Sequence, residues 1–104
     1  MNKTKSPKTL DEAYQIVLDE LLEMFLKKHK DYGKGNILSI KELGIAFRVA
    51  EKIERLKNLY MKQDAPANES IEETWEDIAT YAIIAVLYNR GWFQKLEVEK
   101  KKIT

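Results

Sequence analysis

The sequence has no cysteine and few of the residues that interrupt helices. Its 104 residues include four glycines, two prolines and one histidine. The absence of cysteine excludes a disulfide framework, a thiolate metal site and a cysteine nucleophile. With His29 as the single histidine, a Ser–His–Asp arrangement is not credible, and we expect His29 to lie at the end of a helix. The scarcity of glycine and proline favours an all-α chain.

The sequence also lacks a long apolar run and an excess of charge of one sign. Its longest apolar stretch, residues 81–88, is far shorter than the roughly 20 residues that a membrane-spanning helix needs. The 18 basic and 17 acidic residues give a formal net charge of +1, which provides no general attraction to nucleic acid or to an anionic membrane. The start, MNKTKSPKTL, has no apolar run of the signal-peptide kind. We therefore expect a cytoplasmic protein that binds neither nucleic acid nor membrane.

The length predicts one domain. Residues 1–8 are polar and rich in lysine, which is typical of a flexible N-terminal arm, and residues 9–104 are expected to form a single all-α domain. A chain of this size buries a core with little margin, and oligomerisation is a common supplement.

Three capping-box patterns predict the starts of three long helices. They pair Thr9 with Glu12, Ser39 with Glu42, and Ser70 with Glu73. Loops are expected at residues 29–38 and 63–69, with Gly33 ending the first helix and Gly91 capping the third. A short fourth helix should begin at Trp92.

Apolar spacing predicts which helix faces are buried. Residues three and four apart form the expected core stripe of the first helix: Tyr14, Val17, Leu18, Leu21 and Phe25. The corresponding stripe of the second helix contains Val49, Ile53, Leu56 and Tyr60. Residues 78–88 are apolar on every side, so this helix should lie at the centre of a bundle, at a subunit interface, or both.

Paired carboxylates on two successive helices are the strongest chemical signal. Glu51 and Glu54 share one face of the second helix with Phe47, well over 90° from the core stripe. Glu73 and Asp77 are one turn apart on the next helix. If the helices are antiparallel, the four carboxylates could converge, and their mutual repulsion predicts a divalent cation. Oxygen ligands select Mg²⁺ or Mn²⁺, which commonly bring phosphates.

Each of these pairs also has a simpler interpretation. Glu51 is four residues before Arg55, so it could belong to a solvated charged face. Glu73 could have no role beyond closing the capping box with Ser70, and Asp77 could pair with a neighbouring lysine.

The expected loop and the cations of the second helix could hold a nucleotide. Lys28, Lys30 and Lys34 could bind phosphate. Tyr32 could stack on a base, and Asp31 or Asn36 could read its edge. Three further cations could neutralise phosphate or hold the carboxylates in position: Arg48, Lys52 and Arg55. The alternatives are a charged connection between helices and ordinary surface charges. The loop has no GxxxxGK[ST] pattern, so it is not a P-loop.

Three runs follow one another in a recognisable order and spacing: KDYGKGN, GIAFRVAEKIERLKNL and ESIEETWEDIATYAIIAVL. Together they cover about residues 28–90. This arrangement resembles the nucleotide-modification-associated domain type 1, which is often phage-encoded. It is also similar to the MazG-like all-α nucleoside triphosphate pyrophosphohydrolases, as a divergent member.

The resemblance implies a helical bundle, assembled as a homodimer or homotetramer, that binds magnesium and a nucleoside triphosphate. The related enzymes cleave between the α- and β-phosphates and release a monophosphate and pyrophosphate. We therefore expect a magnesium-dependent pyrophosphohydrolase made of three long helices and a short fourth. The alternatives are a protein that binds or sequesters a nucleotide without hydrolysing it, and a helical interaction protein with no small ligand.

The resemblance also assigns residues to the reaction. Glu51 and Glu54 match an ExxE pair, and Asp77 matches the aspartate of an ExxD pair, so these three are the expected catalytic residues. Two positions depart from the pattern, because Thr74 replaces the glutamate of ExxD and Ala50 precedes Glu51. Glu73 shares a helix face with Asp77, so it could substitute as the fourth metal ligand.

Overall fold

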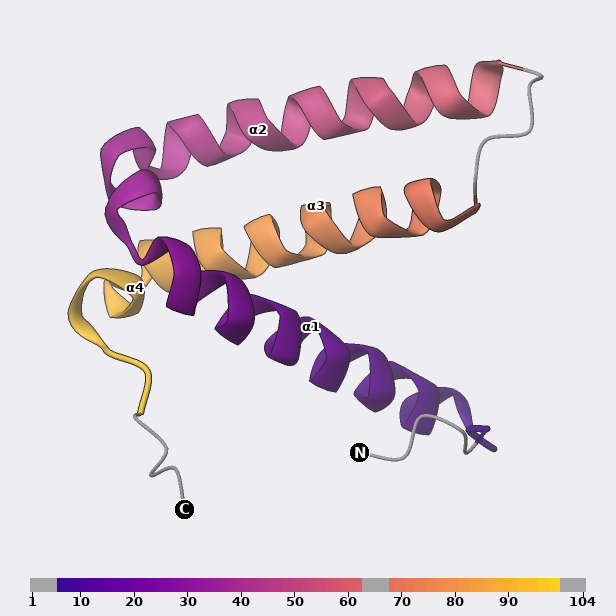
Figure 1. The fold of residues 1–104 in the computed structure, drawn as a ribbon, viewed down its shortest axis with the longest axis horizontal. Helices are drawn as coiled ribbons and strands as arrows, with labels where there is room; N and C mark the ends of the chain where they lie inside the picture. Colours follow the sequence, from indigo (N-terminus) through magenta and orange to yellow (C-terminus); the bar gives the residue numbers. More distant parts are fainter. Residues whose placement is uncertain (1–5, 63–67, 100–104) are drawn as a thin grey trace.

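The computed structural model describes residues 6–62 and 68–99, and within these ranges it contains helices and no strand. Figure 1 shows three long helices and one short helix: α1 (Leu10–Tyr32), α2 (Gly35–Met61), α3 (Asn68–Asn89) and α4 (Trp92–Lys95). The predicted all-α class and the predicted set of helices are therefore confirmed. Among the described residues, no helix combines the length and the hydropathy that are needed to cross a membrane.

Helix α3 is the central element of the fold. It runs antiparallel to α2, contacts α1 on another side, and meets α4 at its C-terminal end (Figure 1). Helix α1 crosses α3 at an angle, so its N-terminal half lies apart from α2. The molecule measures 44 × 37 × 24 Å, which is the shape of an open, flat arrangement and not of a closed cylinder. The apolar sequence of α3 therefore agrees with its central position.

Both ends of α1 have the predicted local chemistry. The Thr9 hydroxyl accepts a hydrogen bond of 3.2 Å from the Glu12 backbone N–H, as in a capping box. The Glu12 carboxylate accepts from the Lys8 N–H at 2.9 Å. Gly33 ends the helix with φ of 67°, where a side chain would be strained, and its N–H donates to the His29 carbonyl. His29 lies in the last turn of α1, as expected.

The remaining boundaries differ from the prediction. Only Gly33 and Lys34 separate α1 from α2, so the expected loop over residues 29–38 is mostly helical. Ser39 does not cap a helix, because its hydroxyl donates to the Asn36 carbonyl at 2.8 Å. The interruption in α2 falls instead at Lys41, which has φ of 59° and ψ of −170°. With Ser39 as the expected N-cap, the prediction placed the start of this helix five residues too late.

The third capping box is also wrong, because α3 begins at Asn68 and Ser70 therefore lies within the helix. Gly91 has the left-handed conformation expected of a helix C-cap, with φ of 77°, and its N–H donates to the Tyr88 carbonyl. Residues 1–5 of the expected arm and residues 63–67 of the expected loop lie outside the described residues.

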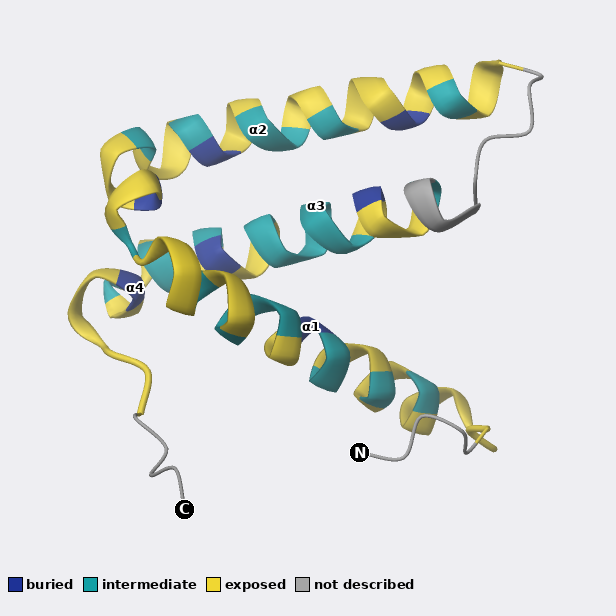
Figure 2. Ribbon diagram, in the orientation of Figure 1, coloured by how far each residue is buried: buried dark blue, intermediate teal, exposed yellow. Residues whose placement is uncertain are grey.

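The buried core is small and lies mainly where the first turns of α2 meet the end of α3 and α4 (Figure 2). The buried cluster there contains Ile37, Ile45, Ile84 and Phe93, and Leu21 and Leu56 are buried elsewhere. Two of these six, Leu21 and Leu56, belong to the predicted core stripes.

Much of the predicted core is exposed in the described chain. Tyr14, Val17 and Leu18 of α1 face solvent, as do Ile53 and Tyr60 of α2. Ile83 and Val86 of α3 are also exposed within one chain, so the expected burial of α3 at the centre of the bundle is incomplete, and its expected place at a subunit interface stays a prediction. The reason is the splayed path of α1, which covers only part of α3 and leaves its own stripe largely uncovered.

Ile45 provides a test of this core. Replacing Ile45, which is almost fully buried, with alanine should lower the free energy of unfolding by about 2–5 kcal/mol because it leaves a cavity. The matched control is Leu43→Ala on the exposed side of the same helix, which should change it by about 0.5 kcal/mol or less. Urea unfolding followed by circular dichroism measures both. Equal losses would contradict this description of the core.

Candidate functional site

A pocket of about 230 Å³ lies between α1, α2 and α3. Its polar lining includes Lys28 and Tyr32 from α1, Asn36 and Lys52 from α2, and Asp77 and Thr80 from α3. Its apolar lining includes Ile84 from α3 and Phe93 from α4. The α3 residues repeat at positions i, i+3 and i+7, which lie on one side of a helix. The pocket therefore has a charged end near Asp77 and an apolar end near Ile84.

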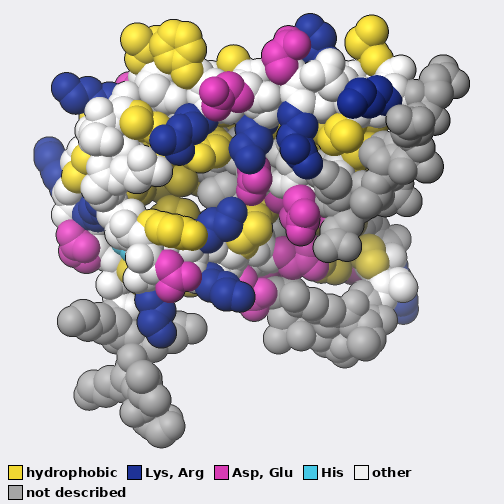
Figure 3. All heavy atoms as spheres, turned by 45° about the horizontal axis from the view of Figure 1, so that its top comes forward, with side chains coloured by type: hydrophobic (Ala, Val, Ile, Leu, Met, Phe, Trp, Pro, Cys, Tyr) yellow, Lys and Arg dark blue, Asp and Glu magenta, His cyan; other side chains and the backbone are white. Residues whose placement is uncertain are grey.

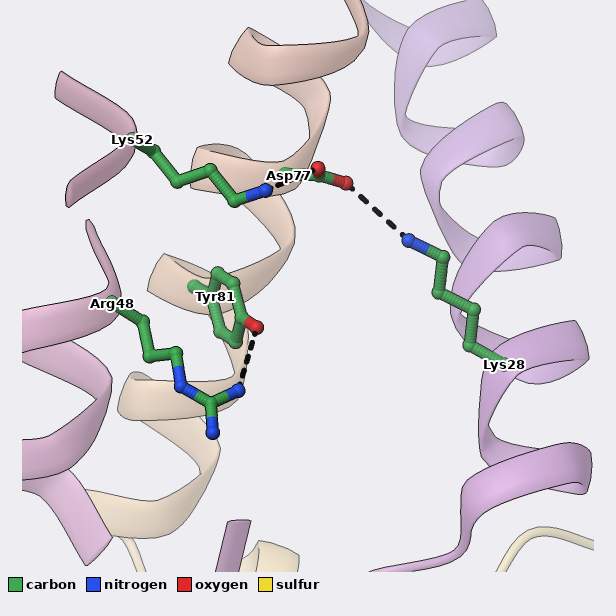
Figure 4. Close-up of polar contacts among 5 residues, drawn as sticks. All are labelled: Lys28, Arg48, Lys52, Asp77 and Tyr81. Atoms are coloured by element: carbon green, nitrogen blue, oxygen red, sulfur yellow. Dashed lines mark hydrogen bonds and ion pairs between the residues drawn. The ribbon is translucent and has the colours of Figure 1, made fainter. Parts of the chain in front are cut away.

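Asp77 stands between two lysines from the neighbouring helices (Figure 4). The Lys52 ammonium donates to one carboxylate oxygen at 3.0 Å, and the Lys28 ammonium donates to the other at 3.3 Å. All three side chains are partly exposed, with accessible fractions of 25% for Asp77, 33% for Lys52 and 54% for Lys28. Solvent screens such pairs, so each contributes about 1 kcal/mol at most. An incoming anion can therefore compete for the lysines.

Arg48 adds a third cation beside the pocket. Its guanidinium donates to the Tyr81 hydroxyl at 3.3 Å (Figure 4) and to the Asn36 side-chain oxygen at 3.4 Å. Both hydrogen bonds are longer than the usual 2.9–3.0 Å optimum for N–H donors. Lys28 and Lys52 pair with one carboxylate and Arg48 lies nearby, so this group of four side chains carries a formal net charge of +2. The charged end of the pocket favours an anionic ligand.

Thr80 leaves a hydroxyl without a partner in the wall of the pocket. Its Oγ1 is buried and makes no hydrogen bond within the described part of the chain. An unpaired buried polar group costs about 1–3 kcal/mol, and a threonine in a helix commonly avoids that cost by donating to the carbonyl four residues earlier. A polar atom of a ligand or a water molecule in the pocket would remove this cost.

The apolar end of the pocket is built from aromatic rings. Phe25 and His29 are stacked with ring centroids 5.3 Å apart, and His29 meets Phe93 edge to face at 6.4 Å. All three residues line the pocket. His29 is therefore held by ring packing at the end of α1, and this end of the pocket offers apolar faces to a flat ligand ring.

A family model described as "Nucleotide modification associated domain 1" matches residues 28–88, which is more than half of the chain. The chain belongs to this family. The matched segment includes every residue that lines the pocket except Phe25 and Phe93. No curated protein matches the chain, and no solved structure matches it. The pocket lining therefore lies almost wholly within the segment that matches this family.

In this member of the family, the four predicted metal ligands do not converge within one chain. Glu51 and Glu54 are exposed, and Glu54 accepts from Lys57 at 3.0 Å. Glu73 is also exposed, so only Asp77 of the four lines the pocket. Across the described residues, no group of three or more His, Cys, Asp or Glu side chains could hold a metal ion. Asp77 instead pairs with Lys28 and Lys52, as the simpler interpretation of this residue predicted.

The rotation of α2 explains why the carboxylates stay apart. At 100° per residue, Glu51 and Glu54 lie more than 100° from buried Ile45 and Leu56. Arg48, Lys52 and Arg55 lie between those two sides. In the space-filling view, Lys and Arg side chains form a row along α2, with Asp and Glu side chains on both sides of it (Figure 3). A strip of cations therefore separates the two predicted carboxylate pairs.

Lys34, a predicted phosphate ligand, contacts the C-terminal segment of the domain. Its ammonium donates to the Leu96 carbonyl at 2.6 Å and to the Glu97 carboxylate at 2.9 Å. This hydrogen bond and the lysine charge hold the pKa of Glu97 below its ordinary value. Lys30, Asp31 and Arg55 are exposed and do not line the pocket.

Of the predicted substrate-binding residues, Tyr32, Asn36 and Lys52 line the pocket, and Arg48 contacts two lining residues. Lys28, which the sequence suggested as a possible phosphate ligand, also lines the pocket, whereas sequence reasoning did not select Thr80 and Tyr81 as ligand-binding residues. The signal that could have found the last two is their spacing from Asp77, because residues three and four positions later share its helix face.

Replacing Lys34 with methionine tests its role as an anchor. The change removes the hydrogen bonds to residues 94, 96 and 97, so amide hydrogen exchange over residues 92–98 should accelerate by about fivefold, corresponding to roughly 1 kcal/mol. Lys30→Met, at an exposed position of α1 outside this contact, is the control and should leave the exchange unchanged. Unchanged exchange in both variants would show that Lys34 does not hold this segment.

Proposed function

We propose that this protein binds a nucleotide in the pocket between α1, α2 and α3. The observation that carries the proposal is the pairing of two lysines with one carboxylate, with Arg48 nearby, at one end of a pocket whose other end is aromatic. Phosphates require the first feature and a base suits the second. Membership of a nucleotide modification associated family supports the same ligand class.

The phosphates would bind at the charged end. Lys28 and Lys52 approach from opposite helices, so a phosphate between them would accept charge-assisted hydrogen bonds from both. Asp77 holds the two ammonium groups near each other in the absence of ligand. Arg48 would add a third donor after releasing its long hydrogen bonds to Tyr81 and Asn36.

The nucleoside would occupy the inner part of the pocket. From Asp77 to Ile84 the axis of α3 rises by about 10 Å, which covers the change from charged to apolar lining. The Thr80 hydroxyl is then available to the sugar or the base, and Tyr32 can stack at the rim. The volume of about 230 Å³ is below the usual range of about 300–1,000 Å³ for whole small-molecule ligands. The phosphates would therefore project into solvent.

A second candidate function is hydrolysis of nucleoside triphosphates to monophosphates and pyrophosphate with Mg²⁺ or Mn²⁺. Two observations favour this function. Asp77 lies in the pocket wall, and it stands at the aspartate of the ExxD pattern of the MazG-like enzymes that the sequence resembles. The donor set of one described chain does not fit such an ion, because Glu51, Glu54 and Glu73 are exposed and outside the pocket lining. Binding is therefore the primary proposal.

Replacing Lys52 with methionine tests binding. The variant keeps the apolar stem and removes the charge, so the dissociation constant should rise about tenfold or more, since hydrogen bonds to charged groups contribute about 1.5–3 kcal/mol. Calorimetry with a panel of ribonucleoside and deoxyribonucleoside triphosphates, without divalent metal, measures the effect. Lys57→Met is the matched control, because Lys57 is on the same helix but pairs with Glu54 outside the pocket. Binding that is equally strong in both variants, or absent from the wild-type protein for every nucleotide, would overturn the proposal.

Asp77→Asn separates binding from hydrolysis. Removing the negative charge makes the pocket more positive, so metal-free nucleotide binding should become several-fold tighter. If the protein is a metal-dependent hydrolase, wild-type protein should release pyrophosphate with Mg²⁺ or Mn²⁺, and this variant should lose that activity. Absence of pyrophosphate release from every nucleotide by the wild-type protein would eliminate the second candidate and leave the first intact.

A further inference from the structure

Phe93 closes the apolar end of the nucleotide pocket from outside the three long helices. It belongs to the C-terminal segment, residues 92–98, which contains α4 and follows the turn at Gly91. Its buried ring is part of the same cluster as Ile84 of α3 and meets His29 of α1 edge to face. The ring also lines a second cleft of about 140 Å³, together with residues 96–98. The position of the C-terminal segment therefore sets the shape of the pocket at its apolar end.

Apolar packing holds the C-terminal segment only weakly. Helix α4 is a single turn of four residues, and so short a helix is not stable without contacts to the rest of the protein. Phe93 is the buried residue of α4, whereas Leu96 and Val98 keep 60% and 42% of their surface exposed. The segment therefore needs a further attachment to keep Phe93 in the pocket wall.

Lys34 provides that attachment. Its ammonium donates to the carbonyls of Gln94 and Leu96, at 3.5 and 2.6 Å, and to the Glu97 carboxylate at 2.9 Å. An ammonium has three N–H donors, so these acceptors account for all of them. The Lys34 side chain is only 14% exposed, and it lines the second cleft but not the nucleotide pocket. Lys34 is thus directed toward the C-terminal segment and not toward the proposed phosphates.

These hydrogen bonds join two walls of the nucleotide pocket. Lys34 directly precedes α2, and its neighbours Gly33 and Asn36 line the pocket. The first of its acceptors, the Gln94 carbonyl, directly follows Phe93, which lines the pocket from the C-terminal segment. Lys34 therefore fixes Phe93 relative to the junction of α1 and α2 without itself lining the pocket.

We propose that Lys34 is a positioning residue of the nucleotide pocket, which holds Phe93 where it contacts the nucleoside. This inference rests on the proposed function. The phosphates would bind near Asp77, about 10 Å along the axis of α3 from Ile84, so the C-terminal segment acts on the nucleoside and not on the phosphates. Docking of the segment and binding of the nucleoside are then coupled, and each stabilises the other by the same factor.

Two probes separate this role from a direct contact with phosphate. Calorimetry without divalent metal compares a panel of ribonucleoside and deoxyribonucleoside triphosphates with inorganic tripolyphosphate, which has no nucleoside. Lys34→Met should raise the dissociation constant of the nucleotides by about fivefold or more. It should change that of tripolyphosphate by less than about twofold at physiological ionic strength, where distant charges are screened.

Lys95→Met is the matched control, because Lys95 is exposed on α4 and lines neither the nucleotide pocket nor the second cleft. It should bind both probes like the wild-type protein. Equal weakening of both probes by Lys34→Met would make Lys34 a phosphate ligand, and unchanged nucleotide binding would remove its role, so either result overturns the inference alone. A wild-type protein that binds no nucleotide would instead overturn the proposed function.

Hydrogen exchange of the wild-type protein provides a second test that needs no substitution. Because the coupling is reciprocal, a saturating nucleoside triphosphate should slow amide exchange over residues 92–98 by about fivefold or more, and saturating tripolyphosphate should leave it unchanged. Residues 10–18 of α1 do not line the pocket and serve as the internal control. If a nucleotide that binds leaves the exchange of residues 92–98 unchanged, or if tripolyphosphate slows it equally, the coupling is absent and the inference is wrong.

Discussion

The position of Asp77 between Lys28 and Lys52 is the interaction on which the site depends. The three residues come from α3, α1 and α2, so one carboxylate joins all three long helices at the mouth of the pocket. The stabilisation is small because the side chains are partly exposed. Its more important effect is geometric: the carboxylate brings two ammonium groups from opposite helices to one point, where an anion could contact both.

The same arrangement supports an anion, and not a metal ion, as the proposed ligand of this pocket. Two lysines occupy the carboxylate oxygens that a cation would need, and Arg48 adds further positive charge one turn away. A divalent ion would have to displace both lysines and recruit ligands from residues outside the pocket. A phosphate would need only to share the lysines. The lower cost of accommodating a phosphate supports nucleotide binding, and not metal-dependent hydrolysis, as the primary proposal.

Local chemistry explains which features could be predicted from the sequence. The cap at Thr9 and the glycine ends at Gly33 and Gly91 depend on neighbouring residues alone, and all three are present. Ser39 followed by Glu42 satisfied the same local rule, but the chain interrupts its helix at Lys41. Lys41 is exposed and has a positive φ, a backbone conformation that a lysine in the sequence does not predict. Residues spaced one helical turn apart indicate that a helix is present, but they do not show at which of several residues it begins.

The arrangement of the site could not be predicted from the spacing of residues along the sequence. Glu51, Glu54, Glu73 and Asp77 have the spacing of a metal site, and their convergence depended on how α2 is rotated about its axis toward α3. Ile45 and Leu56 fix that rotation by occupying the buried side, which turns Glu51 and Glu54 outward. Lys28 reaches Asp77 only because α1 crosses α3 at that point. A crossing angle is set by packing across long sequence separation, which no spacing rule encodes.

The two halves of helix α1 have different surroundings. Its C-terminal half provides Lys28, His29 and Tyr32 to the pocket, and its N-terminal half carries exposed apolar side chains, among them Leu10 and Tyr14. Lys28 contacts Asp77 from α1, so the packing of α1 against α3 sets the distance between these two side chains. The charged end of the pocket therefore depends on the same long-range packing that the spacing of residues along the sequence does not reveal.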